Sequence, residues 1–213
     1  TGQNLIAGAP GANAGLAPAD VASAIDALRP AVVLANLEVS DACVIAAARG
    51  AARAGAMFIL NPAPFRPLSP ELLALVGVLT PNAVEAASLL GHDDGPWDDL
   101  YERLSAQGLE QLVVTLGERG ARLLSVEGGV WLPARPVRAI DTTGAGDAFN
   151  GVLAASLAAG IDAEESVRRA VDAATMSTLR RGARAGLPTG AELLGFLSGQ
   201  PVAESARGRP PQG

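Results

Sequence analysis

Residues 31–60 read AVVLANLEVSDACVIAAARGAARAGAMFIL, and this stretch decides the fold class. The runs AVVLA at 31–35 and AMFIL at 56–60 are short and continuously apolar, which is typical of parallel strands covered on both faces. Residues 41–54 between them are expected to form a helix. This alternation predicts an α/β fold with a mostly parallel sheet and helices on both faces.

The same alternation extends along the chain in both directions. Further strands are expected at residues 4–9, 76–80 and 111–116, and further helices at 18–28, 69–75, 82–90, 97–107, 147–159, 163–180 and 189–197. Residues 121–126 and 130–133 flank Gly128 and Gly129, which predicts a hairpin. We interpret residues 1–198 as one domain and expect the Gly-, Pro- and Arg-rich residues 199–213 to be a disordered tail.

The bulk composition narrows the functional classes. The chain has 213 residues, of which 49% are hydrophobic, and this suits one substantial globular domain or a large part of one. A net charge of −6 argues against a basic nucleic-acid-binding surface. Cys43 stands alone, so neither a disulfide framework nor a zinc spacing is expected, and a cytoplasmic location is the simplest interpretation. No apolar run reaches about 18 residues, so no membrane partner is expected.

Residues 141–151, DTTGAGDAFNG, form the motif with the most chemical content. They contain neither the G-x-x-x-x-G-K-[ST] of a P-loop nor the G-x-G-x-x-G of a dinucleotide site. They read as a helix start in which Gly144, Ala145 and Gly146 leave backbone N–H groups free to hold a phosphate. Asp147 beside that phosphate could remove a proton from an attacking hydroxyl. A Gly-rich turn followed by an ordinary helix-capping acid explains the same residues, and the residues alone leave both interpretations open.

DTTGAGDAFNG resembles the C-terminal signature of the ribokinase family of carbohydrate kinases, also called the PfkB family. Other segments resemble family segments in the same order, namely GAPGANAGL at 8–16, ILNPAP at 59–64, LTPNAVEA at 79–86, VVTLGERGA at 113–121 and RRGARAGLP at 180–188. The likeness runs from about residue 1 to residue 197. It implies a ribokinase-like fold and the ATP-dependent phosphorylation of a sugar, with D-ribose, ribose 5-phosphate and ADP as the expected substrate and products.

The resemblance also implies roles for individual residues. Asp147 matches the catalytic base and a sugar contact, while Gly144, Ala145 and Gly146 match the anion hole. The nucleotide site would include Asn82, Thr115, Gly117, Gly120 and Val171. Val171 would lie near the adenine. An ordinary turn at the end of a strand also explains residues 115–120. Glu85 would bind magnesium through a water molecule. Asn82 and Glu85 are also explained as a reciprocal helix cap, and both roles can hold at once. Glu38 matches a glutamate that contacts the sugar.

A potassium site is implied by the same resemblance. Its matching positions are Asp141, Thr143, Ser177, Arg180, Gly182 and Gly186, where carboxylate and carbonyl oxygens suit a hard monovalent cation. Gly186 departs from the hydroxyl residue of the family pattern. The cofactors implied in all are ATP, Mg²⁺ and K⁺.

The family pattern begins before the first residue of this chain. Its earlier part supplies an aspartate and a G-G-K-G-A-N-type stretch that bind sugar, several strands, and a β-lid that forms the contact of a homodimer. We therefore expect the N-terminal strands and lid to be absent, and the chain to be inactive alone. Two other functions stay open: a non-catalytic nucleotide-binding remnant, and a related kinase for another sugar or nucleoside.

Overall fold

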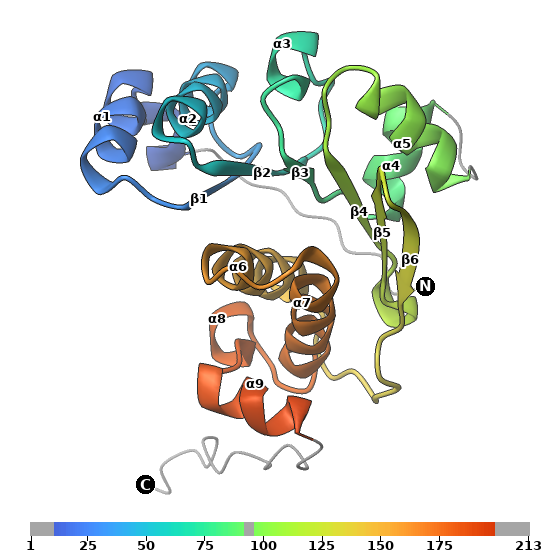
Figure 1. Cartoon of the computed structure of the whole chain (residues 1–213). Helices are drawn as coiled ribbons and strands as arrows, with labels where there is room; N and C mark the ends of the chain where they lie inside the picture. The colour runs from blue at the N-terminus through green and yellow to red at the C-terminus, as the bar shows by residue number, and fades with distance from the viewer. Residues whose placement is uncertain (1–10, 92–95, 199–213) are drawn as a thin grey trace, which may run out of the picture.

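One six-stranded sheet organises the part of the chain that the structure describes (Figure 1). The computed structural model describes residues 11–91 and 96–198. Four parallel strands are followed by an antiparallel hairpin, in the spatial order β1 (Val32–Asn36), β2 (Met57–Asn61), β3 (Val78–Leu79), β4 (Gln111–Thr115), β5 (Ala121–Ser125) and β6 (Gly128–Leu132). The expected α/β class with a mostly parallel sheet is confirmed.

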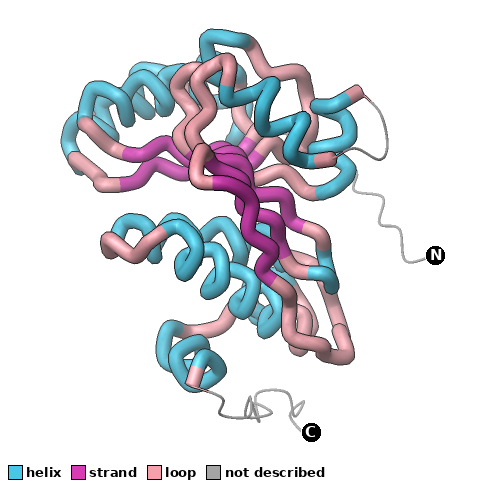
Figure 2. Tube along the Cα trace, turned by 45° about the vertical axis from the view of Figure 1, so that its right-hand side comes forward, coloured by secondary structure: helices cyan, strands magenta, loops and turns pink. Residues whose placement is uncertain are grey.

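Helices cover both faces of this sheet (Figures 1 and 2). One face carries α1 (Pro18–Leu28), α2 (Asp41–Ala54), α3 (Pro70–Leu73), α4 (Ala83–Leu90) and α5 (Trp97–Ser105). The other carries α6 (Ala145–Ala158) and α7 (Ala163–Ser177), with α8 (Ala183–Gly186) and α9 (Gly190–Leu197) packed against α7. Two short 3₁₀ helices, Gly11–Gly15 and Gly117–Arg119, complete the described elements.

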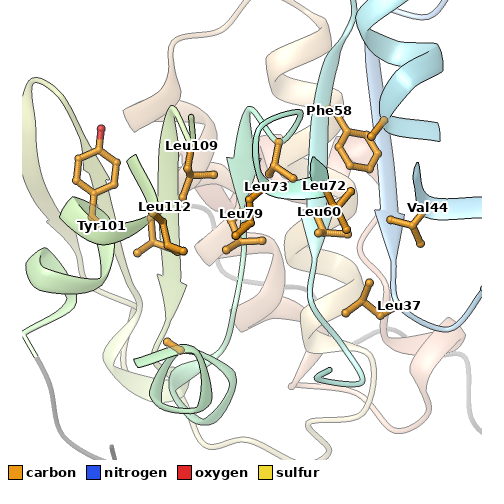
Figure 3. Packing of buried hydrophobic residues seen from close by; sticks show 14 of the residues in the cluster. Leu37, Val44, Phe58, Leu60, Leu72, Leu73, Leu79, Tyr101, Leu109 and Leu112 are labelled. Atoms are coloured by element: carbon orange, nitrogen blue, oxygen red, sulfur yellow. The ribbon is translucent and has the colours of Figure 1, made fainter. Parts of the chain in front are cut away.

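The apolar strands divide their side chains between the two helical layers. Phe58 and Leu60 of β2 pack in the cluster under α1–α5, whereas Ile59 between them packs in the cluster under α6 and α7. Successive side chains of a strand point to opposite faces, so a strand buried on both sides needs an unbroken apolar run. Figure 3 shows the first cluster, in which Leu60, Leu79 and Leu112 of neighbouring strands meet side chains of the covering helices.

Helix ends follow local capping signals. The Ser69 side chain accepts a hydrogen bond from the N–H of Leu72 and begins α3, and Gly91 in the left-handed region ends α4. A capping box of Thr189 and Glu192 begins α9. These boundaries were predictable because each signal lies within a few residues of the end that it determines.

Other boundaries differ from the expectation. The hairpin turns at residues 126–127, and Gly128 and Gly129 belong to β6, where a Cβ on Gly129 would lie 2.5 Å from the guanidinium of Arg122 across the strands. α6 begins at Ala145, two residues earlier than expected. α7 ends at Ser177, where the N–H groups of Thr178 and Leu179 donate to the carbonyls three residues earlier in place of four. The carbonyl of Thr178 then accepts N–H groups from the loop before α6.

The expected strand at 4–9 and the expected tail at 199–213 lie outside the described residues. Within residues 11–91 and 96–198, the helices are too short or too polar for a membrane-spanning segment.

Candidate functional site

Two cavities lie on either side of the start of α6. The first, of about 1080 Å³, opens between the loops that follow β3, β4 and β6 and the helix α7. The second, of about 810 Å³, follows β1 and is lined by residues of α1, α2, β1, β2 and α6. Ala145 and Gly146 line the first cavity, and Asp147 lines the second. A group bound in one cavity would therefore meet a group bound in the other at this turn of helix.

The start of α6 presents free backbone donors. The N–H of Ala145 already donates to the carbonyl of Thr142 over 3.2 Å. The N–H groups of Gly146 and Asp147 have no acceptor among the described residues. Unpaired N–H groups at a helix N-terminus carry partial positive charge and bind anions such as phosphate. Of the predicted anion-hole residues, Gly146 thus supplies a free donor. Asp147, which was predicted as a base and a sugar contact, adds a second one.

A buried polar network fixes this helix start against the sheet. The hydroxyl of Thr80 donates to Oδ1 of Asn150 over 2.6 Å, and Nδ2 of Asn150 donates to the carbonyl of Gly146 over 2.9 Å. Nδ2 of Asn61, at the end of β2, donates to the carbonyl of Thr80 over 2.8 Å. Sequence reasoning assigned no role to these side chains, although Asn61 and Asn150 lie inside the quoted segments ILNPAP and DTTGAGDAFNG.

The first cavity gathers the residues predicted for a nucleotide. Asn82, Thr115, Gly117 and Gly120 line one side and Val171 of α7 another. The N–H of Thr115 donates to the carbonyl of Pro81, which joins the loops after β3 and β4. Gly120 has a φ of +96°, and a Cβ there would collide with the carbonyl oxygen of Leu132. Only glycine allows the end of β6 to close over this loop.

Asn82 and Glu85 form a reciprocal helix cap. Oδ1 of Asn82 accepts the N–H groups of Val84 and Glu85, and Oε2 of Glu85 accepts the N–H of Asn82 over 2.8 Å. Burial raises the pKa of Glu85, and the hydrogen bonds from Asn82 oppose that rise. Asn82 lines the first cavity, whereas Glu85 is only 8% exposed and does not line it. The cap is present, and the magnesium role stays a prediction.

Metal-binding side chains are sparse around this cavity. Over residues 11–91 and 96–198, three or more His, Cys, Asp or Glu side chains nowhere gather closely enough to hold a metal ion. A magnesium ion bound with a nucleotide takes most of its ligands from phosphate oxygens and water, with one or two carboxylates at most. Asn82 lines the cavity, and Glu85, which does not, could act on such an ion only through water.

Asp141 ties the loop before α6 to the segment after α7. Its Oδ1 accepts the N–H of Thr143 over 2.9 Å, and its Oδ2 accepts the N–H of Gly182 over 2.8 Å. These hydrogen bonds, that from Gly182 first, lower the pKa of Asp141 to about 2. The N–H groups of Ile140 and Asp141 donate to the carbonyl of Thr178 over 2.7 and 3.2 Å. The loop that leads to the anion-binding turn is thus fixed at several points.

The residues predicted for a cation meet at this junction. A Cβ on Gly186 would lie 2.8 Å from the carbonyl oxygen of Ser177 and 3.6 Å from that of Arg180. The two carbonyl oxygens therefore face a small space that a side chain at Gly186 would fill. Asp141, Thr143 and Gly182 lie at the adjoining loop through the hydrogen bonds given above. Hard oxygen donors of this kind fit a potassium ion.

Glu38 is exposed and does not line the second cavity. Its N–H donates to Oδ1 of Asn36 over 3.1 Å. Arg66 holds the loop on both sides of it by donating to the carbonyls of Leu37 and Val39. Asn36 and Asn61 line the second cavity with Asp147, and sequence reasoning did not single out either amide. The structure thus brings Asp147 together with these two amides and that of Asn150, and leaves Glu38 outside the cavity lining.

The chain is similar to known carbohydrate kinases in its sequence and in its fold. A family model described as pfkB family carbohydrate kinase matches residues 1–190. The chain is 35% identical over 198 residues to the ribokinase of Bacillus subtilis, an alignment that covers 92% of this chain and 66% of that protein. Its fold resembles the crystal structure of ribokinase from Thermotoga maritima, with a TM-score of 0.82 and 30% identity over 92% of this chain and 66% of that one.

A further match is the structure of Arabidopsis thaliana ribokinase complexed with ribose and ATP, with a TM-score of 0.78 and 27% identity over 82% of this chain and 58% of that one. The chain spans slightly less than two thirds of the first two relatives and a smaller share of the third. The structural matches confirm the α/β fold that the resemblance implies.

Proposed function

The chain belongs to the pfkB family of carbohydrate kinases, and from this premise we propose that its protein transfers the γ-phosphoryl group of ATP to D-ribose. One observation carries the proposal: the free N–H groups at the start of α6 separate a cavity lined by nucleotide-loop residues from a cavity lined by Asp147. A nucleotide in the first cavity would point its terminal phosphate at a hydroxyl bound in the second.

Asp147 acts as the general base in this proposal. It accepts the proton of the primary hydroxyl of ribose as that oxygen attacks the γ-phosphorus and the bond to the β-phosphate oxygen breaks, giving ribose 5-phosphate and ADP. The N–H groups of Gly146 and Asp147 lie where negative charge gathers on the transferred group. Because phosphoryl transfer needs little covalent participation by the protein, positioning and charge stabilisation supply most of the rate enhancement.

The buried network of Asn61, Thr80 and Asn150 supports this geometry. It holds the carbonyl of Gly146, and with it the first turn of α6, against the ends of β2 and β3. Rigid support of donors matters because an anion hole is effective only when its N–H groups need no rearrangement during the reaction.

Two metal ions belong to the proposal. Mg²⁺ would accompany the phosphates near Asn82 and Glu85, and would offset their negative charge. K⁺ would be held by the carbonyl oxygens of Ser177 and Arg180 with Asp141 nearby, as the space at Gly186 suggests. For Mg²⁺ the protein contributes the loop after β3, which the cap at Asn82 holds in place, and for K⁺ it contributes the loop before α6, which Asp141 holds in place.

The test is sugar-dependent ADP release by the full-length gene product. D-ribose, 2-deoxyribose, D-fructose and a purine nucleoside are compared at matched concentrations with ATP and Mg²⁺. The proposal expects the highest kcat/KM with D-ribose. A clear preference for another sugar or for the nucleoside would replace the substrate. ATP binding without turnover on any of them would favour the non-catalytic nucleotide-binding alternative.

A further inference from the structure

Residues 133–140 form the first part of the connection from β6 to α6, have no regular secondary structure and contribute to the lining of the first cavity. The segment is anchored at its two ends. Near its start, Pro133 and Ala134 pack against Gly120, and at its end the N–H of Ile140 donates to Thr178. Between these anchors, residues 134–139 make no backbone–backbone hydrogen bond within the described part of the chain. Their position must therefore depend on side-chain contacts.

Arg135 supplies those contacts. Its Nε lies 3.2 Å from Oδ1 of Asp172, and its Nη2 donates to Oδ2 of the same carboxylate over 3.3 Å. Its Nη1 donates to the carbonyl of Phe196 over 2.9 Å, and its guanidinium carbon lies 4.3 Å from the centre of the Phe196 ring. A planar guanidinium bound on two edges and one face has a well-defined orientation. Arg135 thus joins the segment to both α7 and α9.

Asp172 is an unusual partner because its side chain is only 7% exposed. Burial raises the pKa of Asp172, and Arg135 opposes that rise. A buried carboxylate is costly unless a cation pairs with it, and Arg135 is the cation that does so within residues 11–91 and 96–198. Replacing both partners by apolar residues is often neutral for stability. Overall stability therefore does not by itself account for the pair.

The pair joins two segments that both line the cavity. Arg135 and Val137 line it from the segment after β6, and Val171, which directly precedes Asp172, lines it from α7. The ion pair consequently fixes the position of the segment relative to α7 next to Val171.

We infer that Arg135 is a positioning residue for the nucleotide: through Asp172 and Phe196 it holds residues 134–139 at the separation from α7 that an adenine nucleotide requires. The inference rests on the proposed function, because it takes the first cavity as the nucleotide site. In this inference the ion pair contributes to nucleotide affinity and takes no part in the phosphoryl transfer itself.

The test measures ADP binding to the 213-residue chain by titration calorimetry with Mg²⁺ present. Arg135→Ala and Asp172→Asn are each expected to weaken binding at least tenfold. The double variant should be no more than about twofold weaker than the worse single variant, because both changes break one contact. Arg138→Ala is the matched control, since Arg138 is an exposed arginine of the same segment that does not line the cavity. It should stay within twofold of wild type.

Kinetics separate positioning from general loss of structure. In the full-length gene product, Arg135→Ala should raise KM for ATP about as much as it weakens ADP binding, with kcat within threefold. Arg135→Lys, which keeps a charge beside Asp172, should recover part of the affinity.

Should the single variants fail to fold, Arg135→Met combined with Asp172→Leu removes the ion pair without leaving an unpaired buried charge. That variant is expected to fold and still bind ADP at least tenfold more weakly. Wild-type affinity in it, or equal losses in Arg135→Ala and Arg138→Ala, would overturn the inference.

Limited proteolysis by proteinase K without nucleotide separates this inference from the proposed function. If the wild-type chain does not bind ADP, the kinase assignment fails, while the contact of residues 134–139 with α7 and α9 is still measurable. Cleavage within residues 134–139 should then be faster in Arg135→Ala than in Arg138→Ala. Equal cleavage rates in the two variants would reject the positioning role.

Discussion

The hydroxyl of Thr80 donates to Oδ1 of Asn150 over 2.6 Å, a contact that joins the end of β3 to α6 across 70 positions of sequence. Both side chains are buried, and Asn150 passes the contact on to the carbonyl of Gly146. The amide of Asn150 therefore helps to fix the position of the anion-binding turn relative to the sheet.

Replacing Asn150 by Ala should lower the free energy of unfolding by about 1–3 kcal/mol, because it leaves the buried Thr80 hydroxyl without its closest partner. Urea unfolding of the 213-residue chain measures this. Asn13→Ala, at an exposed position, is the control and should change the value by less than about 0.5 kcal/mol. Thr80→Val combined with Asn150→Ala should cost less than the sum of the two single changes. Strict additivity would show that the two side chains do not stabilise one another.

Replacing Asp147 by Asn should reduce kcat of the full-length gene product by about 10²–10⁴-fold, because the amide cannot accept the hydroxyl proton. ATP affinity should stay within a few fold. Glu164→Gln removes an acid from the first turn of α7 and serves as the matched control, with kcat unchanged. A variant at Asp147 that keeps more than a tenth of wild-type kcat would remove this residue from the role of base.

Asp141 should stabilise the fold in a pH-dependent way. Its pKa in the folded chain is about 2, below the ordinary value of 3.8. A lowered pKa gives a stabilisation that is complete above about pH 4 and is lost as the pH falls towards 2. The difference in unfolding free energy between wild type and Asp141→Asn should therefore be largest near neutral pH and shrink below pH 4. Asp99→Asn controls for the removal of one carboxylate. A difference that is constant from pH 7 to pH 2 would contradict the assignment.

Potassium should raise kcat/KM of the full-length gene product, and sodium much less. The reason is that the carbonyl oxygens of Ser177 and Arg180 meet beside the loop fixed by Asp141, which leads to the anion-binding turn. Initial rates in potassium, sodium and tetramethylammonium salts at equal ionic strength provide the measurement. Asp141→Asn should lose the preference for potassium. Equal kcat/KM in the three salts would argue against a functional monovalent site.

The 213-residue chain alone should bind ATP without phosphorylating ribose at a normal rate. The second cavity follows β1, an edge strand within the described part of the chain, and Leu34 on that strand is 38% exposed. A cavity open along an edge orients a sugar poorly and admits water, and both effects slow phosphoryl transfer. A coupled ADP assay with purified chain decides this. Sugar-dependent turnover of about 1 s⁻¹ or more would show that the chain is sufficient.

Much of the fold was predictable because its signals are local. The apolar run around Ile59 identified a parallel strand covered on both faces, and Ser69, Gly91 and Thr189 identified helix ends. The run around Leu34 identified a parallel strand as well, but the expected coverage was wrong there, because β1 lies at the edge of the described sheet and Leu34 is 38% exposed. The candidate site was accessible only through the motif around Asp147 and its resemblance to a family. From residue chemistry alone, an acid at a helix start is explained equally well as a helix-capping residue and as a base beside a bound phosphate. The choice between them depends on the second cavity, which is built from segments that are distant in the sequence.

The sequence by itself determined the order of the elements, their alternation and the helix start that carries Asp147. Periodicity and capping depend on neighbours within a turn or two of chain, and those neighbours are visible in the sequence. The tertiary structure alone decided which groups meet: Thr80 with Asn150, Arg135 with Asp172, and Asp141 with Gly182. Each of these contacts joins residues that lie tens of positions apart, and a short polar side chain carries no local signal of its partner. Burial makes the first two pairings necessary, because Thr80, Asn150 and Asp172 are removed from water and must find their hydrogen bonds within the fold.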